Sequence, residues 1–233
     1  MKIVYRISDA GYSKVKPTYI NNEACLKNFC NVFFDYIHDI QIIADNCSEV
    51  TLTMIAKYID PINIQKVSVG HGAGTFNLAL DLALQEKDDD KIVYFVENDY
   101  LHKQNSPKIL KEGLKLGASF VSLYDHPDKY LDPSRGGNPY CEGGAEDTRV
   151  YLTQSTHWKM TNSTTMTFAA TVETLKRVEP VLRKWTNQGH YPDDFKMFLE
   201  LREQLELLVT PIPGYATHGE SAWLSPLTDW SSI

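Results

Sequence analysis

Polar and acidic residues follow each of five apolar segments in the first half of the chain. They occur at residues 6–9 (RISD), 44–46 (ADN), 70–74 (GHGAG), 97–99 (END) and 124–126 (YDH). If the apolar segments are parallel strands, their carboxyl ends meet at one edge of a sheet, where open α/β sheets bind ligands. One such group alone could be turn chemistry, but its repetition at every strand end favours a ligand site.

The acidic turn Glu97-Asn98-Asp99 follows the most hydrophobic of these segments, residues 92–96. A carboxylate at the exit of a buried strand can hold a hard divalent cation through its oxygens. Such a cation would bridge the phosphates of a nucleotide diphosphate and stabilise it as a leaving group. The simpler interpretation is a polar turn capped by Asp99.

The glycine-rich segment 70–75 (GHGAGT) lies between an expected strand and an expected helix. It does not match G-x-G-x-x-G, because Thr75 takes the last glycine position, and it lacks the Gly-Lys-Ser/Thr of a Walker loop. Two interpretations stay open. The segment is either a tight turn with close packing, or a loop whose backbone lets a sugar or a diphosphate approach.

Two further candidate groups lie late in the chain. His218 belongs to a stretch too rich in glycine and proline to be core. A lone histidine usually has a packing role, but imidazole is also a common partner of carboxylates at metal sites. Asp193 and Asp194 precede an apolar helical pattern, so they are an N-cap pair or include a general base for an acceptor hydroxyl. We expect Asp193 to cap the helix and Asp194 to be the base, kept ionised at neutral pH by the helix N-terminus.

Hydrophobic periodicity predicts the elements that must position these residues. Strands are expected at 2–7, 40–44, 67–69, 92–96 and 118–123, and helices at 21–37, 52–59, 75–85 and 106–116. Alternating strands and helices with short links indicate an α/β fold, a doubly wound and mostly parallel sheet with helices on both faces.

The second half of the chain is less regular. Its pattern predicts a long loop at 125–145, a hairpin at 149–160, a helix over 168–185 broken near Pro180, an amphipathic helix over 193–208, and a tail without a clear helix. We therefore expect one domain over residues 1–233, in which an irregular C-terminal cap covers the sheet and shapes a pocket.

Composition excludes several classes of protein. Hydrophobic residues make up 42 % of the 233 residues and charged residues 23 %, which is ordinary for a globular chain with a buried core. The formal charge of −7 gives no long-range attraction to nucleic acid. No segment reaches the roughly 18 apolar residues of a membrane span. The four cysteines form no CxxC pair, as is typical of free thiols in a reducing cytosol, so we expect a cytoplasmic protein.

In their order along the chain, these residues resemble the GT-A class of nucleotide-sugar glycosyltransferases. The resemblance rests on RISD, ADN, the acidic turn, the Asp-Asp pair and a late THGESAWL. Within this class the sequence is similar to the small glycosyltransferase domain of chlorella-virus capsid glycosylation and its bacterial relatives. The resemblance implies a GT-A-like, Rossmann-like fold, a UDP-sugar donor, a glycan or glycoprotein acceptor, and the host cytoplasm as location if the protein is viral.

The resemblance also implies which part of the chain holds the donor. Residues 1–125 would bind the nucleotide sugar, with the base near Asp45, and residues 126–233 would form the acceptor side. The other expected donor contacts are Arg6, Ser8, Asp9, Gly72 and Asn98.

A metal site and a catalytic base follow from the same resemblance. Asp99 takes the last position of the family's Asp-x-Asp motif and would bind Mn²⁺ or Mg²⁺ together with His218. The chain departs from the motif at its first acidic position, where Glu97 stands. Asp194, or its neighbour Asp193, would match the catalytic base of the inverting members.

Three functions fit these features, and that of a metal-dependent inverting glycosyltransferase fits best. A sugar nucleotidyltransferase has a similar sheet but usually carries a glycine-rich basic loop after its first strand, where this chain has Lys14 and Lys16 but few glycines. A non-catalytic carbohydrate-binding protein is the third. The 4 Trp and 13 Tyr do not separate it from the first, because both would stack sugars on aromatic rings.

Overall fold

A large sheet with helices on both faces forms the centre of the molecule, for which the computed structural model describes residues 1–10 and 14–233. Its strands are β1 (Lys2–Ser8), β2 (Ile40–Asp45), β3 (Ile64–Val67), β4 (Ile92–Glu97), β6 (Phe120–Val121), β7 (Val150–Leu152), β8 (His157–Thr161), β9 (Phe168–Thr171) and β10 (Leu208–Ile212). A separate pair is formed by β5 (Tyr100–His102) and β11 (Ala216–His218). The helices are α1 (Asn22–Val32), α2 (Glu49–Ile55), α3 (Gly72–Leu84), α4 (Ser106–Leu114), α5 (Val172–Thr186) and α6 (Asp194–Glu203).

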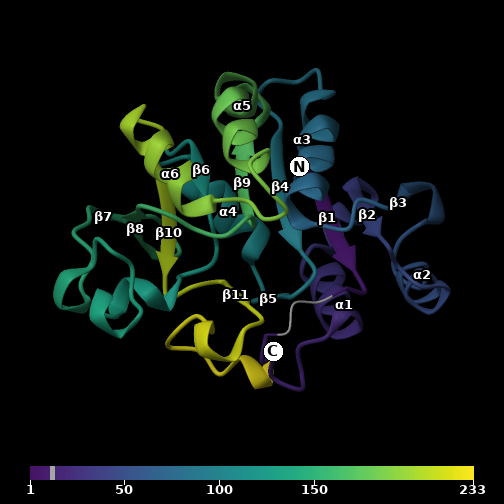
Figure 1. Ribbon diagram of the computed structural model, residues 1–233, viewed down its shortest axis with the longest axis horizontal. Coiled ribbons are helices and arrows are strands. Elements are labelled where there is room, and N and C mark those ends of the chain that lie inside the picture. Colours follow the sequence, from purple (N-terminus) through teal and green to yellow (C-terminus); the bar gives the residue numbers. More distant parts are fainter. Residues whose placement is uncertain (11–13) are drawn as a thin grey trace.

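The nine strands of the main sheet lie in the order β3-β2-β1-β4-β9-β6-β10-β8-β7 (Figure 1). Strands β9 and β8 run antiparallel to their neighbours, and the other seven share one direction. The expected α/β fold with a mostly parallel sheet is therefore confirmed. The second half of the chain supplies β7 to β10, so both halves build one sheet.

Strand β1 shows why both faces of the sheet are covered. Ile3, Tyr5 and Ile7 belong to a core cluster that includes α1, α2 and α4, whereas Val4 packs with α3, α5 and α6 on the other face. Successive side chains of a strand point to opposite faces, so a strand that is apolar at both parities must be buried on both.

The alternation expected for the first half is confirmed, with shifted boundaries. Strand β3 lies about three residues earlier than expected, and α3 begins at Gly72, where His71 caps it, rather than at Thr75. The short strand β5 was not expected, because three residues carry no periodic signal. Residues 11–13 of the segment that follows β1 lie outside the described part of the chain.

The prediction of one helix over residues 168–185 is wrong. Residues Phe168–Thr171 form β9, which lies antiparallel between β4 and β6, and α5 begins only at Val172. A short buried strand cannot be told from a buried helical turn by periodicity alone. Helix α5 also continues through Pro180 without a break, because its buried face holds it against the sheet.

The helix expected over residues 193–208 is shorter than predicted. It ends at Glu203, and Leu205 adopts a left-handed backbone conformation with φ +64°. The chain then enters β10, which runs parallel to β6 and antiparallel to β8. The tail has no α-helix after this strand, as expected, but it contributes β11 and two short 3-10 turns among the described residues.

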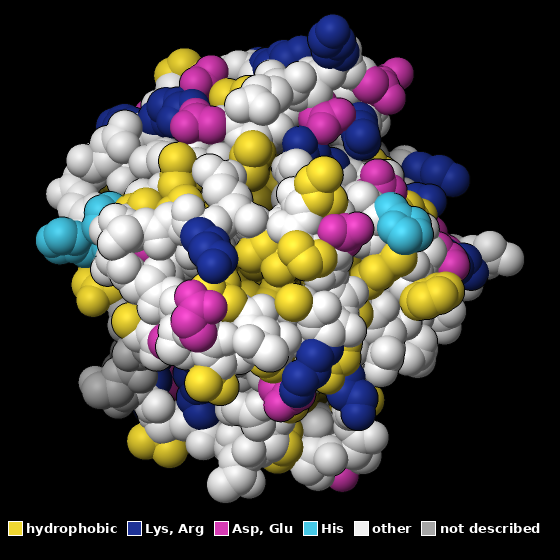
Figure 2. All heavy atoms as spheres, turned by 90° about the vertical axis from the view of Figure 1, so that its right-hand side faces the viewer, with side chains coloured by type: hydrophobic (Ala, Val, Ile, Leu, Met, Phe, Trp, Pro, Cys, Tyr) yellow, Lys and Arg dark blue, Asp and Glu magenta, His cyan; other side chains and the backbone are white. Residues whose placement is uncertain are grey.

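The side of the molecule that carries α2 and β3 is shown in Figure 2. Acidic and basic side chains are interspersed on this face, and hydrophobic side chains gather near its middle. A charged ligand therefore finds no broad patch of one sign on this face.

Each helix in the described part of the chain is too short or too polar to span a bilayer.

Candidate active site

A cavity of about 400 Å³ opens at the carboxyl ends of β1, β2 and β4. Its lining contains most of the residues expected to bind a donor or a metal: Arg6, Ser8, Asp45, Gly72, Asn98, Asp99 and His218. The carboxyl ends of separate strands thus meet at one cavity, as expected for a parallel sheet. Tyr191 and His71 also line it, although no sequence signal assigned Tyr191 to a site.

His218 reaches Asp99 through the small β5–β11 sheet. The antiparallel register pairs His218 with Tyr100, the residue after Asp99. Gly219 permits this approach, because a Cβ at that position would lie 2.7 Å from the Asp99 carbonyl oxygen. As a result, His218 Nε2 lies 3.2 Å from Asp99 Oδ2, and Lys16 Nζ lies 2.9 Å from the same oxygen.

Asp99 and His218 shift each other's ionisation, and the charge of Lys16 adds to the shift of Asp99. Burial alone would raise the pKa of Asp99, but hydrogen bonds and charges from His218 and Lys16 hold that pKa well below its usual range. Burial alone would lower the pKa of His218, yet Asp99, and more weakly Glu97, raise it. Asp99 is therefore a firmly ionised carboxylate at the cavity wall.

Asp99 and His218 fit two coordination positions of a phosphate-bridging ion. Among the described residues, no group of three or more His, Cys, Asp or Glu forms a complete metal site. A Mg²⁺-type ion, however, usually takes one or two carboxylates and completes its shell with substrate phosphates and water. Two ligand atoms that bind one ion at right angles, each at about 2.1 Å, lie about 3 Å apart. The distance between His218 Nε2 and Asp99 Oδ2, 3.2 Å, is close to this value.

Arg6 joins the cavity walls to one another. Its guanidinium donates to the Gly72 and Met166 carbonyl oxygens at 3.2 Å each and pairs with Glu97 at 3.2 Å. The group also lies over the Phe76 ring, 5.5 Å from its centre. Arg6 is buried, so it acts as a fixed counter-charge for Glu97.

Asp45 holds the glycine-rich turn in place. Its Oδ1 accepts from the Val69 and Gly70 amides at 2.7 and 3.1 Å, and its Oδ2 accepts from Gly70 at 2.9 Å. Gly70 has φ +81°, a conformation that favours glycine. A Cβ on Gly74 would lie 2.3 Å from Val69 Cγ1, and the Gly74 amide donates to His71 Nδ1 at the start of α3. The tight turn and the cavity wall are therefore the same structure.

Asp9 and Asn98 have structural partners. Asp9 is absent from the cavity lining, and its carboxylate accepts from the Ser48 amide at 2.6 Å and the Thr51 hydroxyl at 2.5 Å, which fixes the start of α2. Asn98 does line the cavity, and its amide donates to the Ser8 carbonyl oxygen at 3.4 Å.

Asp193 and Asp194 differ in their surroundings. Asp193 caps α6, accepting from the Lys196 amide at 3.1 Å and pairing with the Lys196 ammonium at 2.8 Å. Burial and the charges of Glu97 and Asp193 raise the pKa of Asp194 to about 7. The helix N-terminus thus does not keep Asp194 fully ionised, because burial outweighs it. A pKa near 7 nevertheless suits a general base. Neither residue is in the cavity lining, although Tyr191 of the same segment is.

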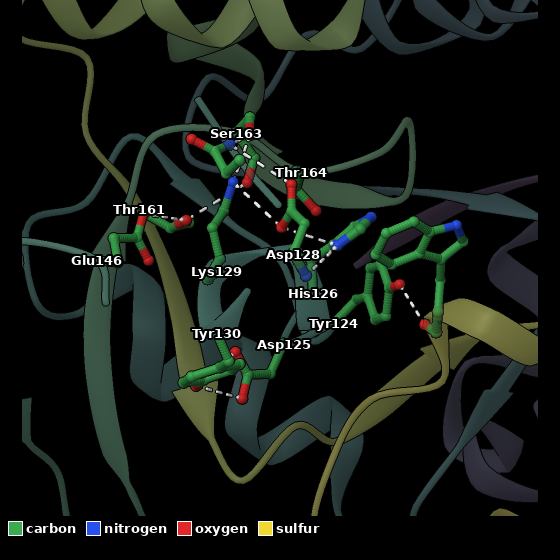
Figure 3. A network of polar contacts seen from close by, with 12 residues as sticks. Tyr124, Asp125, His126, Asp128, Lys129, Tyr130, Glu146, Thr161, Ser163 and Thr164 are labelled. Carbon is green, nitrogen blue, oxygen red and sulfur yellow. Dashed lines mark hydrogen bonds and ion pairs between the residues drawn. The ribbon is translucent and has the colours of Figure 1, made fainter. Parts of the chain in front are cut away.

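A second cluster of charges lies buried in the C-terminal half of the chain. Lys159 Nζ lies 3.1 Å from Asp125 Oδ1 and 3.2 Å from Glu146 Oε2, and its ammonium is 4.3 Å from the centre of the Tyr130 ring. Tyr130 also donates to Asp125, as Figure 3 shows. These contacts fix the loop expected at residues 125–145 against β8.

Lys129 extends this cluster. Its Nζ donates to Asn162 Oδ1 and Ser163 Oγ at 2.7 Å each, and it lies 3.5 Å from Asp128 (Figure 3). Asp128 in turn pairs with His126 at 2.8 Å. We call the cluster the buried loop network: Asp125, His126, Asp128, Lys129, Tyr130, Glu146, Lys159, Asn162 and Ser163.

Comparison with known proteins gives structural matches but no sequence matches. No family model matches the chain, and no curated protein does. The structure of CMP:2-keto-3-deoxy-manno-octonic acid synthetase complexed with CTP is similar with a TM-score of 0.50 and 11 % identity, covering 95 % of this chain and 93 % of that one.

Two further solved structures are also similar. The 4-diphosphocytidyl-2C-methyl-D-erythritol synthase from Anaerococcus prevotii has a TM-score of 0.47 at 14 % identity, covering 99 % of this chain and 92 % of that one. The galactosyltransferase LgtC, in complex with donor and acceptor sugar analogues, has a TM-score of 0.45 at 12 % identity, covering 90 % and 73 %. At these identities a likeness concerns the fold alone, and the match to the synthetase agrees with the GT-A-like α/β fold expected from the sequence.

Proposed function

We propose that this protein is a metal-dependent inverting glycosyltransferase that moves a sugar from a UDP-sugar to a hydroxyl of a glycan or glycoprotein. The observation that carries the proposal is the pair Asp99–His218. The two residues are far apart in sequence, yet they meet at 3.2 Å in the wall of a cavity at the carboxyl ends of three strands. That edge is the ligand-binding edge of open α/β sheets.

The donor would lie in the cavity with its base toward β2. The cavity volume, about 400 Å³, lies within the usual range for small-molecule sites. Asp45 Oδ2 accepts from one backbone amide, so the same oxygen has a second lone pair for a donor group on the base. Ser8 and the backbone at Gly72 border the path from the base to the phosphates.

Asp99 and His218 would hold Mn²⁺ or Mg²⁺, which supplies Lewis-acid stabilisation of the departing diphosphate when bound. Glu97 is engaged by Arg6, so we assign it to the cavity wall rather than to the metal. This assignment accounts for Glu97 at the position where the Asp-x-Asp motif has its first aspartate.

Asp194 would serve as the general base. Its carboxylate takes the proton of the acceptor hydroxyl while the acceptor oxygen bonds to the anomeric carbon. The bond from that carbon to the diphosphate oxygen breaks, and its electron pair leaves with UDP. Attack from the face opposite the leaving group inverts the anomeric centre. Burial raises the pKa of Asp194 to about 7, close to the value at which a base is most effective at neutral pH.

The test combines binding with turnover. Thermal unfolding is measured with Mn²⁺ alone, UDP alone and both together, and UDP release is then measured from a panel of UDP-sugars with candidate acceptors. A ligand at about 100 times its Kd adds about 2.7 kcal/mol to the free energy of unfolding. We expect this stabilisation with UDP and Mn²⁺ together and only a small effect with either alone. Absence of any response to UDP, with or without metal, would contradict the proposal.

A sugar nucleotidyltransferase is the second candidate, and the position of Lys16 favours it. Lys16 follows β1 and lines the cavity, where such enzymes place a basic loop. The two activities release different products. Incubation with CTP or UTP and a sugar phosphate would release pyrophosphate in a nucleotidyltransferase, whereas a glycosyltransferase releases the nucleoside diphosphate from a nucleotide sugar.

A further inference from the structure

Lys16 contacts the carboxylate oxygen that the proposed function gives to the metal. Its Nζ lies 2.9 Å from Asp99 Oδ2, the oxygen that His218 Nε2 also contacts. A divalent ion bound to that oxygen would stand directly beside the Lys16 ammonium. Two cations at such a separation repel strongly at a partly buried site.

We propose that Lys16 is an exchangeable counter-ion, which neutralises Asp99 in the metal-free protein and moves onto the donor's diphosphate when a divalent ion takes Asp99. This inference rests on the proposed function. It adds a residue that couples metal binding to nucleotide binding.

The segment around Lys16 allows this exchange without movement of the backbone. The Val15 carbonyl oxygen accepts from the Ser221 amide at 2.9 Å, and the Pro17 carbonyl oxygen accepts from the Ile20 amide at 3.0 Å. The backbone is thus anchored on both sides of Lys16. The side chain itself is 27 % exposed, and lysine's flexible four-carbon stem can carry the ammonium to a new partner.

The charges of the described lining residues show why Lys16 would be released. Glu97 is matched by the buried Arg6, and Asp45 is matched by backbone amides. Asp99 is matched by Lys16 and His218. When a metal takes over Asp99, the ammonium of Lys16 loses its anion inside the cavity, and the phosphates of the donor supply another.

The exchange predicts reciprocal coupling. Metal alone must displace Lys16 with no new partner for it, and nucleotide alone finds Lys16 already engaged. Each ligand therefore binds more tightly when the other is present, by the same factor.

The experiment measures Mn²⁺ binding by electron paramagnetic resonance and UDP binding by calorimetry for the wild type, Lys16→Gln and Lys57→Gln. Lys57 is exposed, pairs with Glu23 at 3.0 Å and is absent from the cavity lining, so its variant makes the same change of charge away from the cavity.

We expect Lys16→Gln to bind Mn²⁺ alone about ten-fold more tightly, and to bind UDP at saturating Mn²⁺ about ten-fold more weakly, the size of one lost charge-assisted contact. Lys57→Gln should match the wild type in both titrations, and Lys16→Arg, which keeps the charge, should retain the coupling.

Three results would overturn the inference. If Lys16→Gln binds both ligands as the wild type does, Lys16 has no role in either event. If it binds Mn²⁺ alone more weakly, Lys16 supports the geometry of Asp99 instead of competing for it. If the wild type binds neither Mn²⁺ nor UDP, the proposed function fails and the inference fails with it. In the first two results the wild type still binds both ligands, so only the role of Lys16 fails.

Discussion

The cavity and the buried loop network contain the same kinds of charged side chains in opposite settings. At the cavity, the side chains of Lys16 and Asp99 are 27 % and 13 % exposed. In the network, those of Lys159 and Asp125 are 3 % and 1 % exposed, and Lys159 has a second carboxylate and a tyrosine ring as further partners.

We expect this difference to distinguish charges available to a ligand from charges that hold the fold. A buried ion pair that loses one partner leaves an uncompensated charge without water, so its members are fixed to one another. Partly exposed groups beside a cavity can exchange their partners for a ligand or for water at far lower cost. Solvent access, more than residue type, is therefore the reason why we propose different roles for the two clusters.

The largest expected effect concerns Asp194, which is influenced by both regions. The charge of Glu97 in the cavity wall raises its pKa, and the charge of Lys129 in the network lowers it. If Asp194 is the base, Asp194→Asn should bind UDP and Mn²⁺ normally and lose about 10²–10⁴-fold in transfer rate, because the proton acceptor is gone. The wild-type rate should fall as the pH drops below about 7, the pKa to which burial raises Asp194, because the base becomes protonated.

Asp193→Asn is the matched control for this prediction, since asparagine also caps helices well and Asp193 pairs with Lys196. It should keep its transfer activity. If this variant is the inactive one, the roles of the two aspartates are exchanged, and if both variants are active neither is the base.

The next effect tests the network. Lys159→Met should lower the free energy of unfolding by about 3–5 kcal/mol, because Asp125 and Glu146 would face each other without their buried cation. Denaturant unfolding measures this change. The control is Lys176→Met, which removes an exposed pair with Asp89 and should change stability little. An unchanged stability of Lys159→Met would show that the network does not hold the fold.

The corresponding change at the cavity should affect binding more than folding. Asp99→Asn should remove the stabilisation by UDP with Mn²⁺, about 2.7 kcal/mol at 100 times the Kd. Without ligand it should lose less stability than Lys159→Met, because its ion-pair partners Lys16 and His218 are less buried than Lys159. Glu97→Gln is the control, because Glu97 pairs with Arg6, and it should retain the metal-dependent response. An unchanged metal dependence in Asp99→Asn would remove Asp99 from the metal site.

The sequence reveals the cavity better than the contacts within it. Long apolar segments that end in an acid or are followed by one, as β4 ends in Glu97 and β1 is followed by Asp9, can be recognised because burial on both faces leaves few polar positions inside a strand. The meeting of His218 with Asp99 depends on β5 and β11, two strands of three residues each, which are too short to give a periodic signal. The prediction of a helix where β9 lies has the same cause, because β9 has only four residues. The contact of Lys16 with Asp99 depends on the path of a loop, which no pattern in the chain encodes.

The smallest expected effect concerns Asp9, which the sequence assigned to the donor and the structure connects to α2. Asp9→Ala removes the acceptor of the Ser48 amide and the Thr51 hydroxyl, both on the protein surface. Each such hydrogen bond contributes about 1 kcal/mol, and less where water replaces it, so the loss of stability should be about 1 kcal/mol. UDP affinity should not change, because Asp9 does not line the cavity. Thr51→Ala, which removes one of the two contacts, should show a smaller loss of the same kind. If Asp9→Ala instead keeps its stability and binds UDP about ten-fold more weakly, the size of one charge-assisted contact, Asp9 contacts the donor and does not serve to hold the start of α2.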